Sequence, residues 1–192
     1  MSDDSTEHLP SVELESVDES AETPAAPAAD SSAPTPRLNK LRLILVLASV
    51  IILADQLTKS WAVSSLADEP PTHVIWTLQW NLSFNSGMAF SQAQGIGPII
   101  GVVATVVIVG LALSLRKIDN RLALTAAGLI IGGALGNLLD RLFRDDGWMH
   151  GSVVDFIDFQ WFPIFNIADS AITIGGILFA MWSLFSPQVS RR

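Results

Sequence analysis

The chain has 192 residues, of which 49% are hydrophobic and only 16% are charged. This composition is too apolar for an ordinary soluble domain and is typical of a protein that crosses a membrane several times. The absence of cysteine excludes disulfides, thiolate nucleophiles and cysteine-based metal sites, and the three histidines show no paired ligand spacing. We therefore expect no metal and no cofactor, and no nucleotide-binding or nucleic-acid-binding motif is present.

The net charge of −8 belongs to the N-terminal segment, because residues 1–36 hold nine of the 19 acidic residues and none of the 11 basic ones. This segment is rich in Ser, Ala and Pro and has too little apolar area to offset its ordering entropy, so we predict that it is disordered. It lacks the basic start of a signal peptide. A passive solvated extension is favoured over a regulatory or partner-binding tail.

Four apolar runs follow, each close to the ~20 residues that span a bilayer. They predict four transmembrane helices at about 43–66, 95–115, 122–139 and 166–185. These helices form a predicted membrane domain over residues 37–186, and residues 187–192 form a short tail. The third run is rich in Gly and Ala, which favours close packing against neighbouring helices.

The basic residues indicate how the helices are oriented. They gather at the N-terminal flank, in the 116–121 loop and at the C-terminus, whereas only Arg141 and Arg144 fall in the other two loops. The positive-inside rule then predicts that both termini are cytoplasmic and that the loops 67–94 and 140–164 face outward.

The first outer loop contains the segment from His73 to Phe84, which is rich in β-branched and aromatic residues with partial alternation. This pattern predicts a strand or hairpin lying on the membrane surface. Interfacial anchoring alone accounts for the loop aromatics. The residues expected at this depth are Trp76, Trp80, Trp148, Trp161 and Phe162.

Several polar residues stand inside or beside the apolar runs. Asp55 and Lys59 are four residues apart on one helix face, and a structural ion pair is the favoured interpretation. Asn85 and Gly87 lie in a segment typical of a turn that exposes backbone amides.

A second polar group ends the third run. Asn137, Asp140 and Arg141 share one helix face and are expected to need partners, because a half-satisfied buried network is costly. Helix termination with a local Asp–Arg pair and a cluster that holds a catalytic residue both fit this pattern.

Asp155 and Asp169 are the candidate catalytic residues. Asp155 follows two valines in the second outer loop, and Asp169 follows Asn166 at the start of the fourth apolar run, where a helix N-terminus favours an anion. Ionisable groups at a membrane edge are functional candidates, and two close carboxyls share one proton near neutral pH. The alternative makes Asp169 a helix cap and Asp155 a solvated loop charge.

Five short motifs occur in a characteristic order on this four-helix frame. They are Asp55-Gln56-Leu57-Thr58-Lys59, Asn85-Ser86-Gly87-Met88-Ala89-Phe90, Gly136-Asn137-Leu138-Leu139-Asp140-Arg141, Val153-Val154-Asp155-Phe156 and Phe165-Asn166-Ile167-Ala168-Asp169. Together they make residues 40–186 resemble the lipoprotein signal peptidases, also called signal peptidase II.

The resemblance implies an all-α integral protein of the bacterial inner membrane with a small β-cradle on the outer face. It implies an aspartic endopeptidase that cuts diacylglyceryl-modified prolipoproteins just before the lipidated lipobox cysteine, with membrane lipid around it. The catalytic aspartates of the family match Asp155 and Asp169. The supporting positions match Asp55, Lys59, Asn85, Gly87, Asn137, Asp140, Arg141, Asn166 and Ala168.

The chain departs from the family pattern in three places. Met88 stands where a small Ala is common, Arg144 to Met149 lengthens the interval between Asp140 and Asp155, and the acidic tail has no counterpart. A transporter with a charge path and a non-catalytic membrane scaffold are the competing classes. No internal repeat is visible to support the former.

Overall fold

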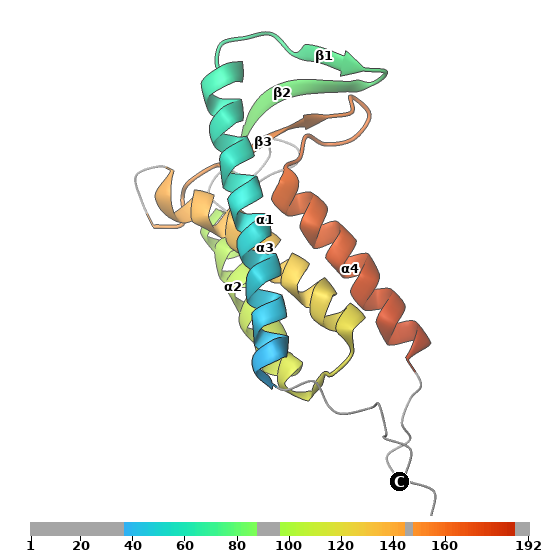
Figure 1. Cartoon of the computed structure of the whole chain (residues 1–192). Helices are drawn as coiled ribbons and strands as arrows, with labels where there is room; N and C mark the ends of the chain where they lie inside the picture. Colours follow the sequence, from blue (N-terminus) through green and yellow to red (C-terminus); the bar gives the residue numbers. More distant parts are fainter. Residues whose placement is uncertain (1–36, 88–96, 145–147, 187–192) are drawn as a thin grey trace, which may run out of the picture. The chain divides into compact units, whose positions relative to one another are not determined.

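The computed structural model describes residues 37–87, 97–144 and 148–186. The predicted tails at 1–36 and 187–192 lie outside the described residues, as do Met88 and Asp145 to Gly147. The elements in chain order are α1 (Arg37–Leu66), β1 (Thr72–Ile75), β2 (Leu78–Asn85), α2 (Gly97–Ser114), the short 3-10 helix η1 (Leu115–Lys117), α3 (Arg121–Phe143), β3 (Val153–Asp158) and α4 (Ile167–Phe185) (Figure 1).

The four long helices are each long and apolar enough to cross a membrane, and with the small sheet they confirm the predicted fold class. α1 begins at Arg37, before the apolar run that starts at Leu43, and α3 continues to Phe143 beyond Leu139. An apolar run marks the part of a helix that suits lipid, whereas Lys, Arg and Leu also favour helix and extend it past that run.

The central helix is α3, which packs against α1, α2 and α4. In an 18-residue apolar stretch of α3, 56% is buried inside the protein, against 11–17% in the corresponding stretches of the other three helices. Its glycines permit this approach. A Cβ on Gly133 would lie 2.4 Å from the Ala168 carbonyl oxygen, and one on Gly136 would lie 2.7 Å from Asp55 Oδ2. The predicted close packing of the Gly-rich run is therefore confirmed.

The sheet has three antiparallel strands in the order β1-β2-β3 and lies at the end of the helices where α1 ends and α4 begins (Figure 1). The hairpin of β1 and β2 pairs Thr72 with Trp80, and β2 pairs Ser83 with Asp155 of β3. The hairpin was predicted from the sequence, whereas β3 falls in a segment that was predicted to be an outer loop. Five of the six residues of β3 are buried, so the strand lacks the polar alternation that predicts a surface strand.

A hydrogen-bonded carboxylate joins β2 to β3. Asp158 accepts from Gln79 at 2.7 Å and from Asn81 at 2.9 Å, and its other oxygen accepts from the Gln160 backbone N–H at 2.6 Å. Burial alone would raise the pKa of Asp158, but these hydrogen bonds to its charged form hold the pKa below its usual value.

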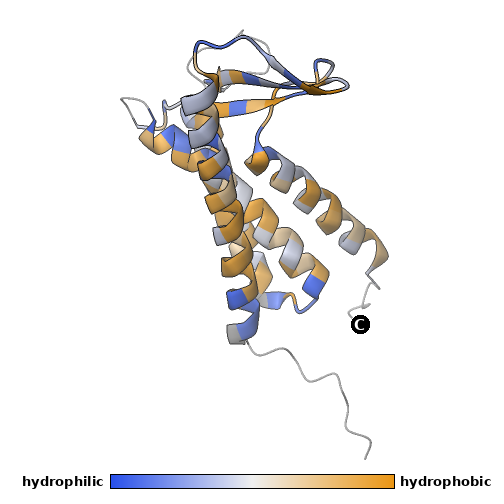
Figure 2. Ribbon diagram, turned by 45° about the horizontal axis from the view of Figure 1, so that its top comes forward, coloured by the Kyte–Doolittle hydropathy of each residue, from blue (hydrophilic) through white to orange (hydrophobic). Residues whose placement is uncertain are grey.

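The sheet covers an apolar cluster at the end of α1, formed by Ala62, Leu66, Val154 and Phe156. Trp80 packs edge-on against Trp61 of α1, with ring centroids 5.6 Å apart, and its predicted position at the headgroups stays a prediction. Figure 2 shows the long helices as largely apolar and the sheet as mixed in polarity. This packing fixes the sheet against the helix ends, where the candidate aspartates lie.

Candidate active site

Asp155 lies on β3, and its side chain is buried in the space between the sheet and the helix ends. Its Oδ1 accepts from the Asn166 side-chain amide at 2.6 Å, and its Oδ2 accepts from the Asn85 amide at 3.1 Å. Burial and the nearby charge of Asp169 raise its pKa from 3.8 to about 6, although the two amide hydrogen bonds oppose this rise. The alternative of a solvated loop charge is therefore wrong.

Asp169 lies in the first turn of α4, at the third helical position. Its Oδ1 accepts from the Asn137 amide at 2.7 Å, and its Oδ2 receives the Asn166 backbone N–H at 3.4 Å. The predicted alternative, in which Asp169 caps the helix, is confirmed in part, because its side chain closes the capping box of α4 but Asp169 is not the N-cap residue. The cap is Asn166, whose side-chain oxygen accepts from the Asp169 backbone N–H at 2.9 Å.

Asn166 connects the two aspartates. Besides capping α4, its fully buried side-chain amide donates to Asp155 and to the Asn137 side-chain oxygen at 3.1 Å. Asn137 in turn donates to Asp169 at 2.7 Å, so Asn166 and Asn137 link the two carboxyls. One asparagine therefore sets the start of α4 relative to the carboxyl of β3.

Lys59 lies at the centre of a buried polar network beneath the aspartates. Its ammonium lies 2.8 Å from Asp55 Oδ2, 2.8 Å from Asp140 Oδ2 and 2.9 Å from the Asn137 side-chain oxygen. Lys59 and Asp55 are fully buried and Asp140 is 1% exposed. The predicted pair of Asp55 and Lys59 is present, and three acceptors satisfy the three donors of the ammonium.

This network reaches the start of α4 through Asp55. Its Oδ1 accepts from the Ala168 backbone N–H at 2.9 Å, so the carboxylate of α1 binds one of the free amides of the helix N-terminus. Asp140 also receives the Val154 backbone N–H at 3.2 Å. α1, α3, β3 and α4 are thus joined through two buried carboxylates and one ammonium.

Two residues of this network, Gln56 and Arg144, were not predicted from the sequence. Gln56 donates to Asp140 at 3.2 Å and to the Gly136 carbonyl at 3.1 Å, and Arg144 pairs with Asp140 at 2.7 Å. The local Asp–Arg pair therefore involves Arg144, not Arg141. The spacing of four residues was a signal for Arg144. Gln56 gave no such signal, because it follows Asp55 directly and its contacts lie on another helix.

The turn after β2 is built by Asn85 and Gly87. The Asn85 side-chain oxygen accepts from the Gly87 backbone N–H at 3.0 Å, while its amide is directed to Asp155. Gly87 has φ 121°, which L side chains rarely adopt, and is buried. The predicted turn is present, and it aims Asn85 at the candidate site.

Arg141 is 5% exposed, yet its Nη1 has no hydrogen-bond partner among the described residues. Asp155, Asp140 and Asp169 all act on its charge electrostatically. A buried donor without a partner is costly, so a fixed guanidinium beside two carboxyls is a feature of a site that receives a polar group.

A cavity of about 310 Å³ opens beside this guanidinium. Its polar wall contains Asn85, Asn137, Arg141 and Asp169, and its apolar wall comes from side chains of α2, α3 and α4 such as Ile100, Ala134 and Ile172. A cavity with polar groups at one end and an apolar wall suits a substrate that carries a polar bond next to apolar groups. No group of three or more His, Asp or Glu within residues 37–87, 97–144 and 148–186 is placed to hold a metal ion.

The sequence candidates thus divide by position. Asp169, Asn137, Asn85 and Arg141 line the cavity, Asp155 is hydrogen-bonded to the lining Asn85, and Asn166 is hydrogen-bonded to the lining Asn137. Lys59, Asp55 and Asp140 lie beneath it as the buried ion-pair network, Ala168 supplies a backbone donor to Asp55, and Gly87 shapes the turn that carries Asn85. All eleven therefore belong to one connected region.

Comparison with known proteins places this region in context. The family model described as signal peptidase (SPase) II matches residues 47–185. A lipoprotein signal peptidase of Mycolicibacterium smegmatis is 41% identical over 157 residues, which cover 81% of this chain and 67% of that protein. One of Mycobacterium tuberculosis strain H37Rv is 40% identical over 162 residues, covering 84% and 80%.

The fold is also similar to a solved bacterial membrane enzyme, with a TM-score of 0.66 and 29% sequence identity over 77% of this chain and 95% of that one. The residues matched by the family model include both aspartates, the buried network, most of α1 and the other three membrane-length helices. On these matches the chain belongs to the signal peptidase II family.

Proposed function

We propose that this protein is an aspartic endopeptidase that removes signal peptides from diacylglyceryl-modified prolipoproteins and cuts just before the lipidated cysteine. The observation that carries the proposal is the pair of Asp155 and Asp169, joined through Asn166, with Asp169 lining a cavity that has one apolar wall. The similarity to lipoprotein signal peptidases supports the prolipoprotein substrate class.

The two aspartates have unequal environments, which supports a division of roles. The raised pKa of Asp155, about 6, favours its protonated form below about pH 6 and leaves part of it protonated closer to neutral pH. Asp169 stands at a helix N-terminus, where negative charge is stabilised by the backbone amides. We assign Asp155 as the proton donor and Asp169 as the base, because two carboxyls in different environments can take these two different roles.

The chemistry follows from these roles. Asp169 takes a proton from water as the water oxygen bonds to the scissile carbonyl carbon, and Asp155 gives its proton to the carbonyl oxygen. When the C–N bond breaks, Asp169 passes its proton to the leaving nitrogen and Asp155 recovers a proton from the hydroxyl group. Arg141 supplies a positive charge beside the cavity where negative charge develops on oxygen.

The location of the site supports a lipid-linked substrate. The cavity has apolar side chains of α2, α3 and α4 on one wall and lies toward the sheet end of membrane-length helices. A diacylglyceryl group left in the bilayer holds the neighbouring peptide bond at this depth. Holding a reacting group in place in this way removes much of the entropic cost of reaction.

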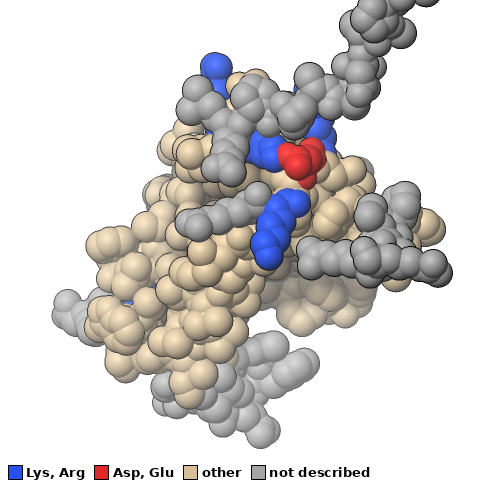
Figure 3. All heavy atoms as spheres, turned by 90° about the horizontal axis from the view of Figure 1, so that it is seen from below, with Lys and Arg blue, Asp and Glu red and all other residues tan. Residues whose placement is uncertain are grey.

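We further propose that both termini are cytoplasmic and that the site faces outward. The start of α1, η1, the start of α3 and the end of α4 all lie away from the sheet (Figure 1). Seen from that end, basic side chains gather around one acidic group (Figure 3). Arg42, Lys117 and Arg121 are exposed at these helix ends, as the positive-inside rule expects of the cytoplasmic side.

The test uses two lipobox peptides of the same sequence, one with a diacylglyceryl cysteine and one with a free cysteine, incubated with the purified protein in micelles. Mass spectrometry then identifies the cleavage position, with a chelator control alongside. We expect cleavage only of the lipidated peptide, just before the cysteine and without effect of chelator. Equal cleavage of both peptides, or cleavage elsewhere, would contradict the proposed specificity.

A further inference from the structure

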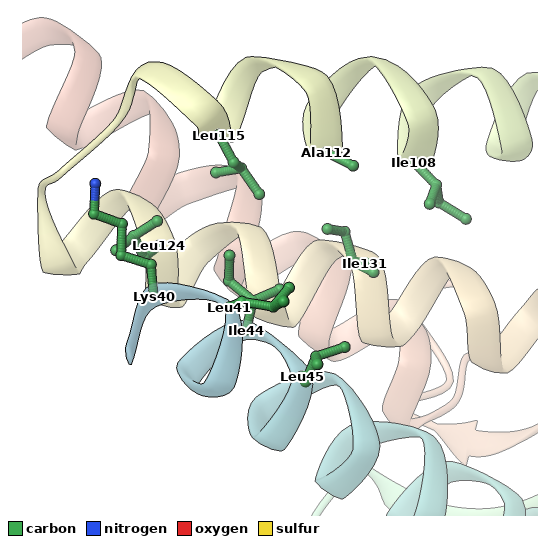
Figure 4. A pocket seen from close by; sticks show the side chains of 9 residues that line it. All are labelled: Lys40, Leu41, Ile44, Leu45, Ile108, Ala112, Leu115, Leu124 and Ile131. Carbon is green, nitrogen blue, oxygen red and sulfur yellow. The ribbon is translucent and has the colours of Figure 1, made fainter. Parts of the chain in front are cut away.

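A second cavity, of about 740 Å³, lies between α1 and α2 toward the end of the molecule away from the sheet. Figure 4 shows its side chains projecting from three sides: Leu41, Ile44 and Leu45 from α1, Ile108 from α2, and Leu124 and Ile131 from α3. A concave, mostly apolar site of this volume lies in the range of ~300–1,000 Å³ that is usual for ligand pockets. We call it the α1–α2 groove.

The groove is floored by α3, on which both α1 and α2 pack. Ile44, Leu115 and Leu124 are already buried together in one cluster at its base. Ten residues of helix, ~10 Å wide and ~15 Å long, occupy roughly 1,200 Å³, which exceeds the cavity volume of about 740 Å³. The groove therefore suits a flexible hydrocarbon chain better than a further helix.

One end of the groove is basic. Lys40 is the only charged residue that lines it among the described residues, and it pairs with Asp119, whose side chain is 63% exposed. Three further basic residues, all exposed, are close in the chain to residues that line the groove. Arg42 directly follows Leu41, Lys117 is two residues after Leu115, and Arg121 is three residues before Leu124. The exposure of Asp119 to solvent weakens this ion pair, so a bound anion can compete with Asp119 for Lys40.

We propose that the α1–α2 groove binds an anionic phospholipid, with one acyl chain in the groove and the phosphate at Lys40, Arg42, Lys117 and Arg121. The inference rests on the basic end of the helices lying at a headgroup layer. Basic pockets between transmembrane helices recognise anionic headgroups in this way, and apolar side chains along the same groove accept the chain. The site lies at the far end of the helices from Asp155 and Asp169 and is separate from the proposed catalytic reaction.

The test measures lipid retained by the full-length protein. Purified protein in detergent is titrated with phosphatidylglycerol or with phosphatidylcholine of the same chains, and bound lipid is counted by native mass spectrometry. Leu41→Trp and Leu45→Trp fill the groove from positions that are 54% and 55% exposed. Leu53→Trp is the matched control, because Leu53 is 61% exposed on the same helix and does not line the groove.

We expect one phosphatidylglycerol to be retained by the wild type and by Leu53→Trp, and to be lost in both groove-filling variants, with all proteins melting alike. Arg42→Gln combined with Lys117→Gln should weaken phosphatidylglycerol binding about 25-fold, roughly fivefold for each lost charge. Equal retention of the two lipids would overturn the proposal, as would unchanged binding by a folded Leu41→Trp or Leu45→Trp. Binding of a second copy of the chain in the α1–α2 groove, in place of lipid, would also overturn the proposal.

Discussion

The side-chain amide of Asn166 donates to Asp155 Oδ1 at 2.6 Å, so the residue that caps α4 also fixes the carboxyl of β3. These residues come from a helix start and a strand that are eleven positions apart. The capping oxygen and the donating amide belong to one planar group. Any movement of the α4 start therefore moves the donor that faces Asp155.

The dual role of Asn166 separates stability from activity. Asn166→Ser keeps a capping oxygen but removes the amide, so we expect stability close to the wild type and cleavage reduced about tenfold, as for loss of a hydrogen bond that positions Asp155. Asn166→Ala should lose the same activity and about 1 kcal/mol of further stability. Thermal melts and initial cleavage rates measure both. A fully active Asn166→Ser would show that this amide does not position Asp155.

The raised pKa of Asp155 predicts a pH dependence of stability. Between its ordinary pKa of 3.8 and its folded value of about 6, the folded protein holds more proton than the unfolded chain. The stabilising contribution is therefore complete below pH 3.8 and is lost as pH rises through about 6. The full loss is at most about 3 kcal/mol.

Asp155→Asn removes this titration. We expect the melting temperature of the variant, relative to the wild type, to rise between about pH 4 and 7 because only the wild type loses stability there. Parallel melts at several pH values measure the difference. A difference that stays constant, or that moves in the opposite direction, would show that Asp155 does not hold a proton in the folded state near pH 5.

The close contact of α3 with α1 at Gly136 predicts that a methyl group added there lowers the stability of the protein. Gly136→Ala would place a Cβ 2.7 Å from Asp55 Oδ2, which must displace the partner of Lys59. We expect a loss of about 1–3 kcal/mol and reduced cleavage. Gly176→Ala is the control, because a Cβ there meets nothing within 4 Å. If both variants melt like the wild type, the close approach at Gly136 does not constrain the network.

Two lysines of α1 form ion pairs that differ in burial. Lys59→Met leaves the buried Asp55 and Asp140 without their shared ammonium, and we expect a loss of about 3–5 kcal/mol. Lys40→Met removes a pair whose acidic partner is 63% exposed, and we expect less than about 1 kcal/mol. Denaturant melts in detergent compare them. Equal losses of stability in the two variants would mean that burial does not determine how strongly the Lys59 network stabilises the fold.

The sequence predicts the four helices well because a run of apolar residues is a direct requirement of crossing lipid. It predicts β3 poorly, since a strand buried on both faces has no alternation and resembles a loop between helices. The pair of Asp55 and Lys59 was visible from helical spacing. The contacts of Gln56 with Asp140 and of Asn166 with Asp155 depend on how α1, α3, β3 and α4 meet, and no local pattern encodes that meeting.

The most direct test of the account compares cleavage of a diacylglyceryl lipobox peptide by the wild type, Asp155→Asn and Asp169→Asn, with thermal melts to show that each variant is folded. We predict that both folded variants lose activity by several orders of magnitude, because each removes one of two proton-transfer groups that act together. Near-normal cleavage by either folded variant would contradict the catalytic pair and direct attention to Asp140.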